Sequence, residues 1–170
     1  MHRSTSRAAL LSSALAALLS CCPVIASAAE QAARPVPAAG GKAIERGRYL
    51  VRIAGCNDCH TPAYAERGGA VPEKEWLTGS PVGFRGPWGT TYAANLRLTM
   101  AALSEDDWVR AAHGKQYRPP MPWFALRDMQ AADLRAIYRF IRHLGPAGEP
   151  APAFVGPGGT PGGPVVQFPG

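Results

Sequence analysis

The run Cys56-Asn57-Asp58-Cys59-His60 constrains this chain more than any other feature. Two thiols and an imidazole at this spacing are typical of the segment that fastens a haem covalently to a polypeptide. Cys56 and Cys59 would form thioether bonds to the porphyrin, and His60 would bind the iron as its proximal ligand. The pattern therefore predicts one covalently attached c-type haem, and a chain that has to wrap a flat apolar group.

Two other kinds of site use similar residues. A thioredoxin-like dithiol should follow a strand and open a long helix among alternating strands and helices, and the sequence has no such alternation. A zinc site needs four ligands, and the histidines left between the motif and the C-terminus, His113 and His143, are far apart in sequence. The haem interpretation is therefore favoured over a redox dithiol or a zinc site.

Residues 1–28 read as a secretory signal peptide. Arg3 and Arg7 form a positive segment, residues 8–19 are apolar apart from two serines, and Ala26-Ser27-Ala28 is a small-residue cleavage pattern. We therefore expect a periplasmic protein, which agrees with the haem motif because haem of this type is attached outside the bacterial cytoplasm.

Two alternatives remain for this leader. It could be a retained membrane anchor, although it is short for a spanning helix. It could also be a lipoprotein signal processed at Cys21, although the bulky Leu19 fits that signal poorly. Only lipidation at Cys21 would tether the mature protein to a membrane.

Cysteine content and charge narrow the function further. Cleavage of the leader would remove Cys21 and Cys22, so Cys56 and Cys59 would be the remaining cysteines and both would be used by haem. The formal net charge is +6, and the basic residues are scattered along the chain and not clustered with aromatic residues. We therefore expect no nucleic-acid partner.

Three segments carry apolar residues at helical spacing, and they predict a small all-α domain: residues 43–54, 104–114 and 131–144. Ser104 and Asp107 form a capping box at the start of the second segment. We expect the first helix to pack on the last.

Gly47 is expected to permit the close approach of these two helices. Tyr49 and Tyr138 are expected to pack at the crossing.

A long stretch rich in Gly and Pro, residues 61–103, shows no sustained period and is expected to form an elaborate loop around the cofactor. Trp88, Tyr92 and Asn95 are its candidate contacts to the porphyrin and its propionates, and the alternative is a surface loop pinned by ordinary aromatic anchors. The expected divisions are a signal peptide (1–28), a flexible segment (29–41), the haem domain (42–147) and a Pro/Gly-rich tail (148–170).

The tail cannot build a core of its own, because its apolar residues are isolated. It is either disordered or an extended strap along the domain, with Phe154 and Phe168 as anchors.

Met121 is the preferred candidate for the second axial position on the iron. It lies in Arg118-Pro119-Pro120-Met121-Pro122-Trp123, where the prolines restrict the backbone and favour a fixed segment that holds a weak thioether ligand, with Pro120 beside the haem. The other candidates are Met129, which is expected to fill the core, Met100, which is expected to pack under the second helix, and His113, which is expected to interact with a helix dipole.

Taken together, the helix before Cys56-Asn57-Asp58-Cys59-His60, the Pro-Pro-Met-Pro segment around Met121 and the C-terminal amphipathic helix resemble class I c-type cytochromes over residues 41–148. Within that class the chain is similar to the cytochrome subunit domains of periplasmic dehydrogenases. The resemblance implies a cytochrome c-like fold with His60 and Met121 as iron ligands.

The resemblance also implies a function. A single-electron carrier of this class would be no enzyme by itself. It would take electrons from a periplasmic dehydrogenase or respiratory complex and pass them to an oxidase or another cytochrome. Two alternatives stay open: a peroxidase-like haem enzyme or ligand sensor with a displaceable distal ligand, and a cytochrome subunit that works only inside a larger dehydrogenase complex.

Overall fold

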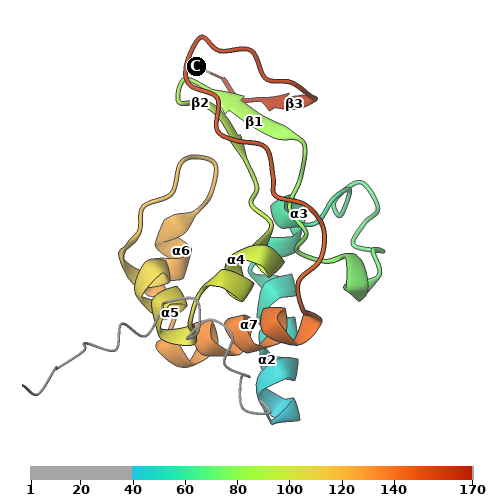
Figure 1. Cartoon of the computed structure of the whole chain (residues 1–170), viewed down its shortest axis with the longest axis vertical. Helices are drawn as coiled ribbons and strands as arrows, with labels where there is room; N and C mark the ends of the chain where they lie inside the picture. Colours follow the sequence, from blue (N-terminus) through green and yellow to red (C-terminus); the bar gives the residue numbers. More distant parts are fainter. Residues whose placement is uncertain (1–39, 170) are drawn as a thin grey trace, which may run out of the picture.

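The computed structural model describes residues 40–169, with the helices of this range gathered at one end and a small sheet at the other (Figure 1). The predicted signal peptide and Cys21 lie outside the described residues. Among the described helices, none combines the length and the apolar character that a membrane crossing needs. The elements are α2 (Gly41–Ile53), α3 (Cys56–His60), η1 (Glu73–Glu75), β1 (Gly83–Gly86), β2 (Gly89–Tyr92), α4 (Leu96–Ala102), α5 (Glu105–Gly114), α6 (Trp123–Asp128), α7 (Ala131–Leu144) and β3 (Val165–Gln167).

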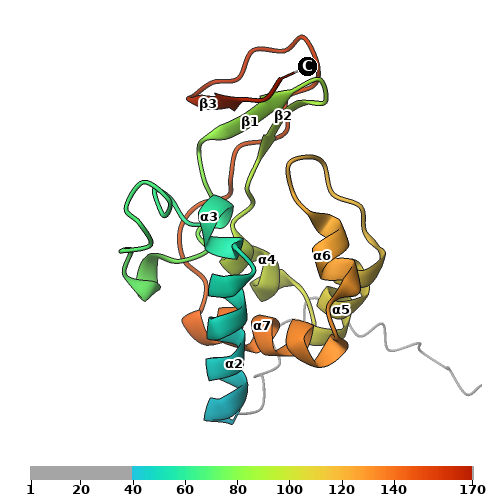
Figure 2. The same cartoon turned by 180° about the vertical axis from the view of Figure 1, so that it is seen from behind.

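Helices α2 and α7 cross, as both views of the molecule show (Figures 1 and 2), and their backbones come into close contact at Gly47. A Cβ atom at Gly47 would lie 2.1 Å from the carbonyl oxygen of Ala136 and 2.7 Å from the Cβ of Phe140. Only a glycine leaves room for this approach, so the predicted role of Gly47 is confirmed.

The two tyrosines expected at the crossing have different environments. Tyr138 is buried in α7, and its hydroxyl donates a hydrogen bond to the carbonyl of Leu103 at 2.8 Å. Tyr49 is 53% exposed, so its predicted packing at the crossing is wrong. The reason is helix geometry, because a residue two positions after Gly47 lies about 200° further around the helix axis.

Helix α5 is fixed to α7 by one buried tryptophan and a cluster of ion pairs. The indole nitrogen of Trp108 donates to the carbonyl of Leu134 at 2.8 Å. Glu105 accepts hydrogen bonds from Arg139 at 2.9 Å and from Arg135 at 3.0 Å. The Ser104 side chain caps α5 by accepting a hydrogen bond from the Asp107 amide at 3.1 Å, as the sequence predicted.

The three predicted helices are therefore present as α2, α5 and α7. The long segment between α3 and α4 is anchored on them by Trp76. Its ring meets Phe140 edge-on at a centroid distance of 6.2 Å, and its indole nitrogen donates to the carbonyl of Val71 at 2.8 Å. Trp76 thus serves as an ordinary core anchor.

A buried arginine closes the C-terminal end of α7. Arg97 in α4 donates hydrogen bonds to the carbonyl oxygens of Leu144, Gly145 at 2.5 Å and Lys74 at 2.7 Å. The last carbonyls of a helix have no partner within the helix, and a guanidinium satisfies several of them at once. Arg97 therefore joins α4, the η1 segment and the end of α7.

The structure contains a three-stranded sheet that the all-α expectation did not include. Its strand order is β2-β1-β3, with β1 and β2 antiparallel and β1 and β3 parallel. These strands have three or four residues each, so they are too short to show an alternating pattern in the sequence. Helices α4 and α6 were also not predicted, for the same reason of length.

The C-terminal tail is an extended strap, one of the two alternatives that its composition left open. The side chain of Asn95 donates to the carbonyls of Ala147 at 2.8 Å and Glu149 at 3.1 Å. Further along, β3 pairs with β1, and Phe168 packs on Trp88 with a centroid distance of 5.6 Å. The tail therefore runs from the end of α7 to the sheet.

The crossing of α2 and α7 generates a stability prediction. The substitution Gly47→Ala should lower the free energy of unfolding by about 3 kcal/mol, because the added methyl group overlaps backbone atoms that cannot move away without separating the helices. Gly41→Ala is the matched control, since nothing lies within 4 Å of a Cβ at that position of the same helix. Urea denaturation followed by circular dichroism measures both variants. Equal stabilities of the two variants would contradict the prediction.

Candidate functional site

The Cys56 to His60 motif folds as a single helical turn, α3, directly after α2. Gly55 separates the two helices in the left-handed conformation, with φ of 69°, which glycine adopts without strain. Residues three apart on a helix lie on the same face, so Cys56 and Cys59 lie on one side of the turn. Both cysteines are free and half-buried.

The thiols of this turn have raised pKa values. Burial raises the pKa of Cys56 to about 11, and burial also raises the pKa of Cys59. Both are therefore protonated at neutral pH. A dithiol that exchanges disulfides needs a lowered pKa to form the reactive thiolate, so this environment argues against the redox-dithiol interpretation.

His60 is held in one orientation by a backbone carbonyl. Its Nδ1 lies 2.7 Å from the oxygen of Ala94, and because a carbonyl only accepts, Nδ1 carries the proton and Nε2 is left with its lone pair. Burial lowers the pKa of His60, against the opposing effect of this hydrogen bond. A neutral imidazole with one nitrogen fixed by a hydrogen bond is the form that binds metal ions.

A buried hydrogen-bond network links the α3 turn to residues 77–79. The Thr61 hydroxyl donates to Oδ1 of Asn57 at 2.8 Å and accepts from the backbone amide of Leu77 at 2.8 Å. The amide of Gly79 donates to the carbonyl of His60, also at 2.8 Å. The Nδ2 atom of Asn57 is buried and has no partner among the described residues.

The zinc interpretation gains no support from the arrangement of side chains. Among residues 40–169, no group of three or more His, Cys, Asp or Glu side chains is close enough together to hold a metal ion. Cys56, Cys59 and His60 thus lack, within this range, the further ligand that a structural zinc site needs.

Met121 lies in the segment between α5 and α6. Its side chain is half-buried and packs against the same hydrophobic core that Cys56 borders. The Pro119-Pro120 peptide bond in this segment is cis. Pro120, which the sequence predicted to contact the haem, is half-buried and directly precedes Met121.

The other candidate ligands have different partners. Met100 is fully buried in the core, and Met129 is half-buried and packs against it, as the sequence predicted for both. His113 is exposed, and its Nε2 lies 3.0 Å from the carbonyl of Met129. The assignment of Met121 as the distal ligand stays a prediction from the sequence, because Met121 and Met129 share the same half-buried position against the core.

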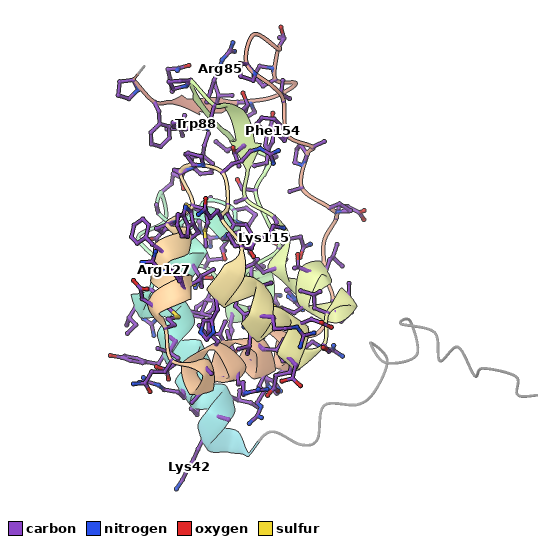
Figure 3. The ribbon with its side chains drawn as sticks, turned by 90° about the vertical axis from the view of Figure 1, so that its left-hand side faces the viewer. Lys42, Arg85, Trp88, Lys115, Arg127 and Phe154 are labelled. Atoms are coloured by element: carbon purple, nitrogen blue, oxygen red, sulfur yellow. The ribbon has the colours of Figure 1, made fainter. Side chains whose placement is uncertain are left out.

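Two predicted haem contacts are engaged elsewhere. Trp88 lies in the turn between β1 and β2, near Arg85 (Figure 3), where its ring packs on Phe168 and its Nε1 lies 3.4 Å from the carbonyl of Phe84. Asn95 uses both groups of its amide, because Oδ1 caps α4 and Nδ2 binds the strap. The structure thus gives both residues roles in holding the fold.

Tyr92 is half-buried at the end of β2. Its ring lies beside Gly83 in the neighbouring strand, 3.1 Å from where a Cβ there would be. This contact places the ring against the sheet.

A surface depression of about 760 Å³ lies against α2 and reaches the α3 turn at Asp58. It is lined mainly by residues of α2 and of the 64–69 loop, including Tyr49, Arg52 and Tyr64. Neither cysteine of the motif, nor His60, nor Met121 lines it. The depression therefore borders the α3 turn without containing the candidate ligands.

Three supporting residues were missed by the sequence analysis. Ala94 contributes only a backbone carbonyl, which leaves no trace in a sequence. Gly79 has φ of 86° and would clash with the amide of Asn95 if it carried a side chain, but Gly is frequent throughout this loop. Thr61 lies four residues after Asn57 in a helical turn, and that spacing was the one signal available.

Comparison with known proteins gives a weak similarity to a dehydrogenase. The chain is 27% identical over 119 residues to one of the subunits of nicotinate dehydrogenase from Pseudomonas putida (strain KT2440). The match covers 65% of this chain but 9% of the relative, so the chain corresponds to a small part of a much longer protein. No family model and no solved structure matches the chain. The similarity is compatible with a role as part of a dehydrogenase complex.

The network beneath α3 generates a second prediction. Thr61→Val should lower the free energy of unfolding by about 3 kcal/mol, because it leaves the buried amide of Leu77 and Oδ1 of Asn57 without their partner. In the control Thr78→Val, the lost hydrogen bond is a 3.2 Å contact to the carbonyl of Glu75 near the surface, and the loss should stay below about 1 kcal/mol. Thermal or urea unfolding compares the two. The assignment of Thr61 as a buried support fails if the control is as damaging.

Proposed function

We propose that this protein is an electron-transfer protein with one covalently bound c-type haem, serving as an electron-transfer subunit or partner of a dehydrogenase. The observation that carries the proposal is the α3 turn, which presents two free thiols on one face beside a neutral, oriented histidine. The donor set fits a covalent haem better than a zinc ion or a redox dithiol, for the reasons of geometry and pKa given above.

Each residue has a defined task in this proposal. Cys56 and Cys59 tether the haem, and their burial keeps the thiols protonated and inert toward exchange until attachment. His60 and Met121 would bind the iron. The haem supplies one-electron chemistry, because its iron exists in ferrous and ferric forms.

The remaining residues orient and protect these ligands. The carbonyl of Ala94 fixes the plane of the His60 ring, and the buried Asn57 and Thr61 side chains fix the turn that carries it. With both His60 and Met121 as ligands, the iron would have no site left for a substrate, so we propose a carrier that is not an enzyme by itself. A displaceable Met121 would instead favour a peroxidase-like enzyme or a gas sensor.

The similarity to a dehydrogenase supports a place inside, or next to, a larger oxidoreductase. The relative is a nicotinate dehydrogenase subunit, and because the match spans 9% of that protein, the proposal names no substrate. We propose a dehydrogenase or quinol-oxidising complex as donor and an oxidase or another cytochrome as acceptor. The location would be periplasmic, on the strength of the predicted signal peptide, with membrane attachment only if Cys21 is lipidated.

Covalent attachment is directly testable. The exported protein should keep its colour on the polypeptide after denaturation and extraction with acidified organic solvent, because thioether bonds survive this treatment. The double variant Cys56→Ala/Cys59→Ala should lose the colour to the solvent. The double variant Cys21→Ala/Cys22→Ala is the control and should retain it. Complete extraction of haem from the parent protein would falsify the proposal of a c-type haem.

The identity of the distal ligand is tested separately. Met121→Ala should abolish the weak near-infrared band that a thioether gives to ferric haem, lower the reduction potential, and open the ferrous iron to carbon monoxide. Met129→Ala, which truncates a half-buried methionine on the same core, should leave all three properties at their parental values.

Two results would contradict the carrier assignment. Rapid carbon monoxide binding by the parent protein would favour the enzyme or sensor alternative. Loss of the band in Met129→Ala, with the band retained in Met121→Ala, would transfer the ligand role to Met129.

A further inference from the structure

The segment that carries Met121 is held from outside by the C-terminal strap. The guanidinium of Arg118 lies 4.0 Å from the centroid of the Phe154 ring. A cation over an aromatic face within about 6 Å is attracted by the ring quadrupole. Arg118 is linked in turn to the candidate ligand, because the amide of Met121 lies 3.3 Å from the carbonyl oxygen of Arg118 in a tight turn.

Phe154 is itself fixed on the β1–β2 hairpin. Its neighbour Val155 exchanges two backbone hydrogen bonds with Thr90, at 2.7 and 3.0 Å. Gly89 makes this contact possible, since a Cβ there would lie 2.4 Å from the carbonyl of Val155 and 3.1 Å from the ring of Phe154. In Figure 3, Phe154 lies at the base of the sheet, between the strands and the segment that starts near Lys115.

The strap is anchored on both sides of this contact. Before it, Asn95 binds the carbonyls of Ala147 and Glu149. After it, β3 pairs with β1, and Phe168 packs on Trp88. A strap held at both ends and bonded at Val155 cannot slide, so the ring of Phe154 is a fixed platform for Arg118.

We infer that Phe154 is a positioning residue for Met121: the strap clamps Arg118 and thereby keeps the thioether in place for the iron. The inference rests on the proposed function, because it needs a haem with Met121 as distal ligand. It adds that the prolines around Met121 are insufficient, and that a contact supplied by the last part of the chain helps to hold the ligand. The sheet then contributes to the site, because its hairpin holds the strap where Phe154 meets Arg118.

The test uses the holoprotein, three substitutions in the strap, and Arg118→Gln alone and combined with Phe154→Ala. Phe154→Ala removes the ring, Phe154→Tyr keeps an aromatic face, and Val166→Ala shortens an exposed side chain of the same strap that lies in β3. The readouts are the near-infrared band of the ferric form, the rate at which added imidazole displaces the distal ligand, and hydrogen exchange of the amides in residues 115–121.

Phe154→Ala should weaken the band, speed imidazole binding by about two- to fivefold, the range expected for loss of an exposed cation–π contact, and raise amide exchange in residues 115–121. Phe154→Tyr and Val166→Ala should match the parent. The double variant Arg118→Gln/Phe154→Ala should be no worse than Phe154→Ala alone, because both substitutions remove one contact.

The inference is overturned if Phe154→Ala behaves like Val166→Ala in all readouts, or if the Arg118 and Phe154 effects simply add. In those cases a band that still disappears in Met121→Ala leaves the proposed function standing. A band that survives Met121→Ala removes the ligand assignment, and the inference about Phe154 with it. Amide exchange can be measured whichever residue binds the iron, so it separates failure of the clamp from failure of the ligand assignment.

Discussion

The direct contact between α2 and α7 at Gly47 is the constraint on which the rest of the structure depends. The backbones meet there without any side chain between them, which places the end of α2 at a fixed position relative to α7. The turn α3 follows α2 after two residues, so the cysteines and the histidine of the motif inherit that position. In α7, the carbonyl of Leu134 accepts a hydrogen bond from Trp108 of α5, and the ring of Phe140 packs on Trp76. The rest of the core therefore packs on the pair of helices that cross at Gly47.

The candidate site is assembled from segments distant in sequence, and backbone groups do most of the joining. His60 is tied to Ala94 through its ring and to Gly79 through its carbonyl. Thr61 ties the same turn to Leu77. Buried polar groups are costly when they lose a partner, so this network holds a single arrangement of the turn. Such rigidity would suit the proposed electron carrier, because a fixed ligand geometry would reduce the rearrangement that accompanies each electron.

The sheet and the strap form the second level of organisation. They pack away from the main core and consist of short strands, so their own stability is small. They connect distant parts of the chain. The strap begins at the end of α7, pairs with the hairpin through Val155 and Thr90, and contacts Arg118 through Phe154. A module of a dehydrogenase complex would offer such a surface for assembly, and the similarity to part of a much longer dehydrogenase chain agrees with a module of this kind.

The sequence alone determined the features that depend on neighbouring residues. The spacing of Cys56, Cys59 and His60 identified the candidate site, helical periodicity located α2, α5 and α7, and Ser104 marked a helix start, because caps and periodicity act over one or two turns. Tertiary structure alone decided the pairing of β1 with β3, the partners of Trp88 and Asn95, and the outward orientation of Tyr49. Strands of three or four residues carry no readable pattern, and residues 83–86 and 165–167 meet only after the chain between them has folded. An amide such as Asn95 can bind a propionate or a backbone carbonyl equally well, and only the nearness of the strap selects the carbonyl.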